Sequence, residues 1–226
     1  MEISLLEEVN RSRAKREVCV VVTRLATGTK ELYHQAELEY HALADEFAKR
    51  VRSGKSGLVE HDGAELFIEV HVPPPRLVII GAVHISQALY PMAQACGFDV
   101  TIVDPRTAFA TEDHFKGVAL HADWPEEILP QVPFDAHTAV AALTHDPKID
   151  DYPLKAALRA HCFYVGALGS RKTHATRLDR MRVAGLSDGE LGRIHAPIGL
   201  DIGAASPSEI AVAVLAQIIA AMRKSD

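Results

Sequence analysis

The sequence has few of the features that mark secreted, membrane-bound or metal-stapled proteins. Its three cysteines include no CxxC pair, and its first 16 residues are charged rather than apolar, so we expect neither a disulfide framework nor a signal peptide. The longest apolar stretch, residues 210–222, is interrupted by Gln217 and is shorter than the roughly 20 residues that span a bilayer. These absences predict a protein of the reducing cytoplasm.

An excess of basic residues is also absent. The 24 Lys and Arg residues against 30 Asp and Glu residues give a net charge of −6, which argues against general binding of nucleic acids or of anionic membranes. The composition, 48% hydrophobic and 24% charged, is that of an ordinary globular protein. A chain of this length buries roughly 70% of its unfolded surface, so it needs no disulfide or structural metal to fold.

Motifs for catalysis or metal binding are missing too. The 12 histidines form no HExxH motif and no cluster with zinc spacing. Gly54-Lys55-Ser56 is not a P-loop, because it follows a helix pattern and precedes a strand pattern. Asp150-Asp151 is interpreted as a helix N-cap rather than as an acid/base pair. We therefore predict no catalytic and no metal-ligating residues.

The clearest break in the chain is Pro73-Pro74-Pro75, because such a run is stiff, extended and without backbone donors. It predicts a small N-terminal α+β domain over residues 1–72 and a larger domain over residues 73–226. In the first domain we expect a strand hairpin, a helix with Gly54 as its C-cap, and a further strand. These elements are predicted over residues 18–22 and 30–34, 38–52, and 66–70.

After the prolines, apolar runs rich in β-branched residues recur and are separated by helical patterns. The runs span residues 77–80, 100–103, 118–120, 139–143 and 163–165. Strands that alternate with helices are typical of parallel βαβ units with helices on both faces. The predicted fold class is α/β, a Rossmann-like doubly wound parallel sheet preceded by the small α+β domain.

Helical spacing predicts one buried stripe and one well-buried helix in the larger domain. The last helix opens with Ser206-Pro207-Ser208-Glu209, a capping box with proline in the first helical position. The buried stripe is formed by Ile85, Leu89, Met92, Ala93 and Cys96. Cys96 is therefore predicted to be a packing residue, and so is Cys162, which begins a core strand.

In doubly wound sheets, ligands bind beyond the carboxyl ends of the strands. The strand over residues 77–80 ends in Gly81-Ala82-Val83-His84, in the position of a dinucleotide-binding G-x-G-x-x-G turn. Val83 stands where that motif has its second glycine, and a β-branched side chain there obstructs the approach of a pyrophosphate. The turn therefore disfavours NAD(P) in its usual pose.

The next strand ends in Asp104-Pro105-Arg106, and Asp104 lies 23 residues after Gly81. An acidic residue at this distance usually accepts a hydrogen bond from a ribose hydroxyl. The same carboxylate could instead accept two N–H donors from an aminopyrimidine or a pterin edge. A third interpretation is an aspartate that caps a turn.

Two later strands end in Thr144-His145-Asp146 and in Gly169-Ser170-Arg171-Lys172, where a helix begins. Two cations at a helix N-terminus oppose the macrodipole unless an anion is bound there. Arg171 and Lys172 therefore predict an anion site. Arg177 and Arg180, further along the same helix, are interpreted as a solvated helix face.

The segment 195–204, His195-Ala196-Pro197-Ile198-Gly199-Leu200-Asp201-Ile202-Gly203-Ala204, is rich in glycine and yet apolar. Such a segment predicts an ordered, packed loop rather than a flexible one. Its place before the last helix would let Gly199 and Asp201 close over a site. A purely structural loop is the alternative.

The motifs quoted above, from the Gly81 turn to the loop over residues 195–204, cover about two-thirds of the chain in one order. Together they resemble the XdhC/CoxI family of xanthine dehydrogenase accessory proteins. The resemblance implies a protein that binds molybdenum cofactor (molybdopterin) and delivers it to a molybdenum hydroxylase of the xanthine dehydrogenase type. It also implies contact with a cofactor sulfurase and self-association as a homodimer.

The resemblance suggests roles for individual residues. The phosphate of molybdopterin suits the helix start at Ser170-Arg171-Lys172, and its pterin edge offers donors to Asp104. His145 and the loop with Gly199 and Asp201 would flank the cofactor. The family also has a cysteine in a glycine-rich Gly-Cys context, which residues 1–72 lack. This departure predicts a short paralogue that works beside a full-length member.

Two other classes of function remain open on the sequence. A nicotinamide-dependent oxidoreductase would use Asp104 to hold the ribose, although Val83 and the missing acid/base pair count against it. An interaction subunit without a ligand would still bind the hydroxylase. The favoured interpretation is an accessory protein rather than an enzyme.

Overall fold

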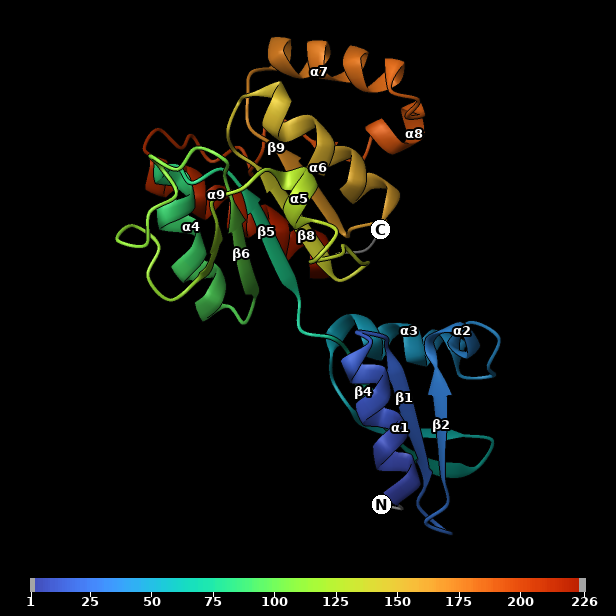
Figure 1. Ribbon diagram of the computed structural model, residues 1–226. Helices are drawn as coiled ribbons and strands as arrows, with labels where there is room; N and C mark the ends of the chain where they lie inside the picture. Colours follow the sequence, from blue (N-terminus) through green and yellow to red (C-terminus); the bar gives the residue numbers. More distant parts are fainter. Residues whose placement is uncertain (1–2, 224–226) are drawn as a thin grey trace. The chain divides into compact units, whose positions relative to one another are not determined.

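The computed structural model describes residues 3–223, and the chain divides into two compact units, Met1–Pro73 and Pro74–Asp226 (Figure 1). The division falls inside the proline run. Each unit has its own sheet and its own hydrophobic core.

The N-terminal unit contains an antiparallel sheet in the order β2-β1-β4-β3. Its central strand β1 alternates between two buried faces, because successive side chains of a strand point to opposite sides. Val20 and Val22 pack with Phe47 of α3, whereas Cys19 and Val21 pack with Val9 of α1. The elements are α1 (Ile3–Ala14), β1 (Cys19–Arg24), β2 (Lys30–His34), α2 (Gln35–Leu38), α3 (Ala44–Ser53), β3 (Gly57–His61) and β4 (Ala64–His71).

The predicted hairpin is confirmed, since β1 and β2 pair antiparallel. The predicted helix over residues 38–52 is wrong at its start, because α3 begins at Ala44. The Nδ1 atom of His41 accepts the N–H of Leu43 at 3.0 Å, a local bond that competes with helical hydrogen bonding. The predicted end is confirmed, with Gly54 as the C-cap at φ 67°.

The C-terminal unit contains a parallel sheet in the order β10-β9-β8-β5-β6-β7, as a Rossmann-like fold requires. The strand order reverses between β5 and β8, so a crevice for ligands is expected beyond the carboxyl ends of these two strands. The strands are β5 (Arg76–Ile80), β6 (Asp99–Val103), β7 (Ala119–His121), β8 (Thr138–Ala142), β9 (Tyr164–Ala167) and β10 (Ile194–His195).

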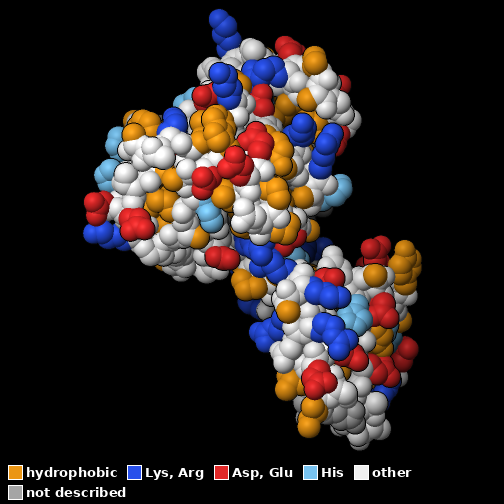
Figure 2. Space-filling view, in the orientation of Figure 1, with side chains coloured by type: hydrophobic (Ala, Val, Ile, Leu, Met, Phe, Trp, Pro, Cys, Tyr) orange, Lys and Arg blue, Asp and Glu red, His pale blue; other side chains and the backbone are white. Residues whose placement is uncertain are grey.

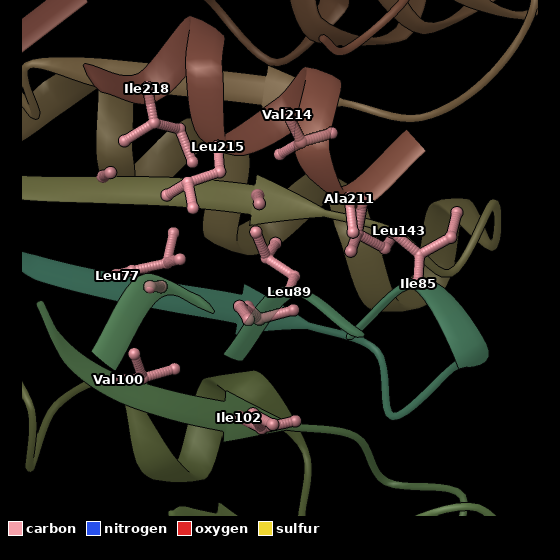
Figure 3. Close-up of a cluster of buried hydrophobic side chains, with 14 of the residues drawn as sticks. Leu77, Ile85, Leu89, Val100, Ile102, Leu143, Ala211, Val214, Leu215 and Ile218 are labelled. Carbon is pink, nitrogen blue, oxygen red and sulfur yellow. The ribbon is translucent and has the colours of Figure 1, made fainter. Parts of the chain in front are cut away.

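Helices cover both faces of this sheet. On one face α4 (His84–Ala95) and α9 (Pro207–Arg223) pack together over β5, β6 and β8, and Figure 3 shows their apolar side chains meeting those of the strands. The opposite face carries α5 (Pro125–Ile128) and α6 (Pro147–Arg159), with Met181 of α7 (Arg171–Val183) and Leu191 of α8 (Asp188–Leu191) joining that core.

The apolar helix α9 carries one polar side chain toward the sheet, Gln217. Its Oε1 atom accepts the hydroxyl of Tyr164 at 2.7 Å and the backbone N–H of Gly199 at 2.8 Å. A buried amide oxygen is tolerated when it is hydrogen-bonded. Gln217 therefore fixes the loop after β10 to the sheet.

Two predictions about cysteines have different outcomes. Cys162 is buried before β9, as expected. Cys96 is exposed, because it is the C-cap of α4 and lies where the helix leaves the core. The predicted stripe therefore ends at Ala93, while Ile85, Leu89 and Ala93 are buried.

No helix within residues 3–223 is long and apolar enough to cross a membrane.

Leu89→Ala is expected to lower the free energy of unfolding of the C-terminal unit by about 2–5 kcal/mol, since it leaves a cavity in a packed core. The side chain of Leu89 is 0% exposed between α4, the sheet and α9. Chemical denaturation followed by circular dichroism measures the change. Val212→Ala is the control, because Val212 of α9 is 48% exposed and should change stability by less than about 0.5 kcal/mol. Equal losses in both variants would contradict this account of the core.

Candidate functional site

The turn after β5 is pressed against the loop after β8. Gly81 has φ +115°, and a Cβ atom there would lie 2.8 Å from Cγ2 of Thr144. Only glycine combines this backbone conformation with such a close approach. The turn and the loop are thus in contact at the position where the strand order reverses.

Asp104, at the end of β6, holds this turn in place. Its carboxylate is 0% exposed and accepts four hydrogen bonds. Oδ2 accepts the N–H of Ala82 and Nη2 of Arg106, each at 2.7 Å, and Oδ1 accepts the N–H and Nε of Arg106 at 3.0 and 2.9 Å. Burial tends to raise the pKa of Asp104, but the bonds from Arg106 and Ala82 outweigh it and hold the pKa below its ordinary value.

This geometry decides between the three interpretations of Asp104. With both oxygens occupied and no exposed surface, the carboxylate has no free edge for a ribose hydroxyl or a pterin. The geometry therefore contradicts the predicted direct contact between Asp104 and a ligand. The third interpretation, an aspartate that caps a turn, describes what is observed. Asp104 is a positioning residue for the Gly81 turn and for Arg106.

Arg106 is the group that Asp104 presents to the outside. Its side chain is 33% exposed, and its guanidinium carbon lies 4.8 Å from the ring centroid of Phe109. The hydrogen bonds that Arg106 donates to Asp104 raise the pKa of Arg106, and the charges of Asp150 and Asp146 add to this effect. Arg106 is thus a fixed cation that faces the loop after β8.

The N-terminus of α4 follows the Gly81 turn. Val83 is its N-cap residue and supplies no side-chain hydrogen bond, while His84 is the exposed first residue. The first N–H groups of a helix have no partner inside the helix, so this end offers backbone donors. The side chain of Val83 is partly buried against the core.

The loop after β8 places His145 in an unusual conformation. His145 is exposed and has φ +64°, a left-handed backbone that few residues other than glycine adopt. Its neighbours hold it there, since the hydroxyl of Thr144 donates to Oδ1 of Asp150 at 2.7 Å and accepts the N–H of Asp146 at 3.0 Å. Asp146 then caps α6 by accepting the N–H of Lys148 at 2.9 Å.

The N-cap of α6 is therefore Asp146, and the prediction that Asp150-Asp151 forms the N-cap is wrong. Asp150 lies inside the first turn and is buried. Burial raises its pKa to about 6, although the bond from Thr144 and the charge of Arg177 lower it. Its Oδ2 atom has no hydrogen-bond partner among the described residues.

Helix α7 begins as predicted, with Ser170 as its N-cap. The hydroxyl of Ser170 accepts the N–H of Thr173 at 3.2 Å, and Gly169 makes the turn at φ +132°. Arg171 and Lys172 are exposed in the first turn. Figure 2 shows Lys and Arg side chains at the α7 end of this unit, with acidic side chains among them.

A cavity of about 250 Å³ lies beside this helix. Two of the predicted site residues, His145 and Lys172, line it, whereas Arg171 does not. The cavity is lined by His145, Pro147, Lys172, Thr173, Thr176, Arg177 and Arg180. No acidic residue is among them.

The predicted solvent-exposed position of Arg177 is wrong, because its side chain is buried. Its Nη2 atom donates to the carbonyl oxygen of Leu168 at 2.9 Å. Arg180 is half-buried and forms a bidentate ion pair with Asp151 at 2.7 and 3.0 Å. The interpretation of both arginines as a solvated face therefore does not hold.

Sequence reasoning missed a signal that could have identified these residues. Thr173, Thr176, Arg177 and Arg180 follow the spacing i, i+3, i+4, i+7, which places them on one face of α7. A helix with a polar stripe and no apolar one buries polar side chains when it packs. Thr173, Thr176, Arg177 and Arg180 form the part of the cavity lining that lies on this face of α7.

Two further predicted site residues lie away from this cavity. Gly199, at φ +96°, is packed against Ala213 of α9 and donates its N–H to Gln217. Asp201 is exposed in the same loop. The loop follows β10, the edge strand beside β9, so it shares the carboxyl end of the sheet without lining the cavity.

The described residues contain no group of three or more His, Cys, Asp or Glu side chains that could hold a metal ion.

Comparison with known proteins adds a family and three relatives. The model of the XdhC Rossmann domain matches residues 77–218. A probable xanthine dehydrogenase subunit of Bacillus subtilis (strain 168) is 34% identical over 155 residues, which make up 68% of this chain and 45% of that protein. Molybdenum cofactor insertion chaperone PaoD of Escherichia coli (strain K12) is 34% identical over 146 residues, 65% of this chain and 40% of that protein.

A third relative, protein YqeB of Escherichia coli (strain K12), is 31% identical over 156 residues, 68% of this chain and 28% of that protein. The chain thus spans less than half the length of these curated relatives. A solved structure from Bacillus halodurans, described as a xanthine dehydrogenase, matches 97% of this chain and 67% of its own with a TM-score of 0.70. At 22% identity, this likeness establishes the fold alone.

Asp150→Asn is expected to raise the free energy of unfolding in a pH-dependent manner. The raised pKa of Asp150 means that its contribution to stability is present below its ordinary value of 3.8 and is lost as the pH rises through about 6. The variant should match the wild type at pH 4 and exceed it by up to about 3 kcal/mol at pH 7.5, at about 1.4 kcal/mol for each unit between the two pKa values. Urea unfolding across this pH range measures the difference.

The charge-matched control is Asp123→Asn, because Asp123 is exposed and lies in the same unit. This control should not diverge from the wild type as the pH rises. Wild-type and Asp150→Asn proteins that keep a constant difference in stability from pH 4 to pH 7.5 would contradict the account of Asp150.

Proposed function

The chain belongs to the XdhC family, whose Rossmann domain matches residues 77–218, and on this premise we propose that it is an accessory protein for a molybdenum hydroxylase. It binds molybdenum cofactor and serves the maturation of an enzyme of the xanthine dehydrogenase type. The names of two relatives support this proposal, since one is a molybdenum cofactor insertion chaperone and the other is a probable subunit of a xanthine dehydrogenase. In this role the cofactor is cargo.

The observation that carries the proposal is the set of hydrogen-bond donors beyond the carboxyl ends of β5, β8 and β9. It comprises the uncapped start of α4, the exposed His145, and the start of α7 at Arg171 and Lys172. Molybdopterin presents a phosphate and a pterin with polar edges, and helix N-termini bind phosphate through free N–H groups and the macrodipole. The residues present therefore fit this ligand.

We assign the phosphate to the start of α7, where Gly169 and Ser170 form the turn. The pterin then lies over the Gly81 turn and the loop of His145, with Val83 and His84 on one side. Arg106 supplies a fixed positive charge beside this turn, held by Asp104. Gly199 and Asp201 flank the bound molecule from the loop after β10.

A nicotinamide cofactor fits these residues less well. Dinucleotide binding uses an acidic residue after the second strand to accept from the ribose, and the carboxylate of Asp104 is already saturated by Ala82 and Arg106. Val83 also occupies the position through which a pyrophosphate approaches. This observation favours cofactor delivery over oxidoreductase chemistry.

The partners follow from the same role. We propose that the protein contacts the molybdenum hydroxylase that receives the cofactor, a sulfurase that matures it, and a full-length paralogue. Self-association as a homodimer completes the proposal. Pull-down of the hydroxylase by the purified protein, with and without bound cofactor, tests the first of these contacts.

The direct test is anaerobic equilibrium binding of molybdopterin to the purified protein, with NADH titrated in a parallel sample. Saturable binding of molybdopterin at about one per chain is expected, because the strand order of the parallel sheet reverses once. Binding of NADH without binding of molybdopterin would replace the proposal with an oxidoreductase. Binding of neither would leave an interaction subunit.

Arg171→Glu is expected to weaken the binding of molybdopterin by at least about fivefold, because it reverses a charge at a helix N-terminus. Arg171 is exposed, so the fold should be unaffected. Arg182→Glu, at the opposite end of the same helix, makes the same change in net charge and should bind as the wild type does. Equal affinities of the wild type, Arg171→Glu and Arg182→Glu for molybdopterin would contradict the assignment of the phosphate to this end of α7.

A further inference from the structure

Arg177 is a buried cation whose hydrogen bonds are incomplete. Its side chain is 2% exposed, and one nitrogen, Nη2, donates to the carbonyl oxygen of Leu168. The other two guanidinium nitrogens, Nε and Nη1, have no partner among the described residues. Unsatisfied buried donors on a charged group are costly, so this arrangement indicates a ligand that completes the bonds.

The acidic groups near Arg177 do not complete them. Burial lowers the pKa of Arg177, whereas the charges of Asp150 and Asp151 raise it. The carboxylate of Asp151 is engaged by Arg180 through both oxygens. Asp150 forms no ion pair with Arg177 within the described part of the chain, and its Oδ1 atom accepts from Thr144. The negative charges of Asp150 and Asp151 therefore act on Arg177 without a direct ion pair among the described residues.

The cavity beside α7 has the chemistry of an oxyanion site. Its lining includes Lys172, Thr173 and Arg177, and no Asp or Glu is among the described residues that line it. The start of α7 adds its partial positive charge, and Lys172 of its first turn lines the cavity. Cationic side chains that converge without a carboxylate between them favour an anion with several oxygens.

We propose that this cavity is the oxyanion site that holds the phosphate monoester of the bound cofactor, with Arg177 as its buried anchor. The assignment to the cofactor rests on the proposed function. At about 250 Å³, the cavity is smaller than the roughly 300–1,000 Å³ of sites that enclose a whole organic ligand. It therefore takes the phosphate group, and the rest of the molecule lies outside it.

The probe for this site is inorganic phosphate, titrated into the full chain by isothermal calorimetry at low ionic strength. Wild-type protein should bind one phosphate per chain, and Arg177→Met should weaken this binding at least tenfold. Arg182→Met is the matched control on the same helix, since Arg182 is exposed and pairs with Asp179 and Asp188 instead. A folded Arg177→Met protein with wild-type affinity would overturn the proposal.

Lys172→Met and Asp150→Asn test the site while leaving Arg177 in place. Lys172→Met lies at the rim of the cavity and should weaken phosphate binding about threefold or more, because it removes one cation from the lining. Asp150→Asn should strengthen phosphate binding, because it removes the negative charge that faces Arg177. Should Arg177→Met fail to fold, unchanged affinity in Lys172→Met would overturn the proposal by itself.

Competition separates this proposal from the function on which it rests. Inorganic phosphate should displace molybdopterin from the wild type but not from Arg177→Met. Simultaneous binding of both ligands to the wild type would overturn the assignment to the cofactor and indicate a site for free phosphate. Phosphate binding that depends on Arg177, with no binding of molybdopterin at all, would contradict the proposed function and leave the oxyanion site standing.

Discussion

The buried carboxylate of Asp104 is the interaction on which the functional end of this protein depends. It joins the turn after β5 to the end of β6 through Ala82, and it holds the guanidinium of Arg106 in a fixed position. Because the turn is fixed, Gly81 can lie against Thr144 at the point where the strand order reverses. A charge in a solvent-free position is stable here because every one of its bonds is made.

In contrast to Asp104, the buried charged groups between α6 and α7 are not fully hydrogen-bonded. Asp150 and Arg177 are both buried, and each has polar atoms without a partner among the described residues. Their neighbours Asp151 and Arg180 form a complete bidentate pair, so pairing between α6 and α7 is geometrically possible. Strained or under-satisfied groups concentrate at functional sites, and His145, with its left-handed backbone at the rim of the same cavity, agrees with this pattern.

The sequence predicted the central strands β5, β8 and β9 well because they are buried on both faces, which gives a continuous apolar run. It missed α1, β3 and β10 for a physical reason in each case. Helix α1 buries only Val9 and Ser12, so it has no apolar stripe. Strand β3 is an edge strand with no fully buried residue, and β10 has two residues. The start of α3 was misplaced because His41 bonds the N–H of Leu43.

The sequence by itself determined the family, the sheet and the order of the loops that form the site, because periodicity, turns and motifs are local properties. It also placed Asp104 and the start of α7 correctly along the chain. Only the tertiary structure decided what these side chains do, since burial and pairing depend on segments far apart in sequence. Asp104 became a positioning residue once Ala82 and Arg106 reached it, and Arg177 became a buried cation once α7 packed beside α6. Desolvation acts on a charge through the neighbours that the fold assembles around it.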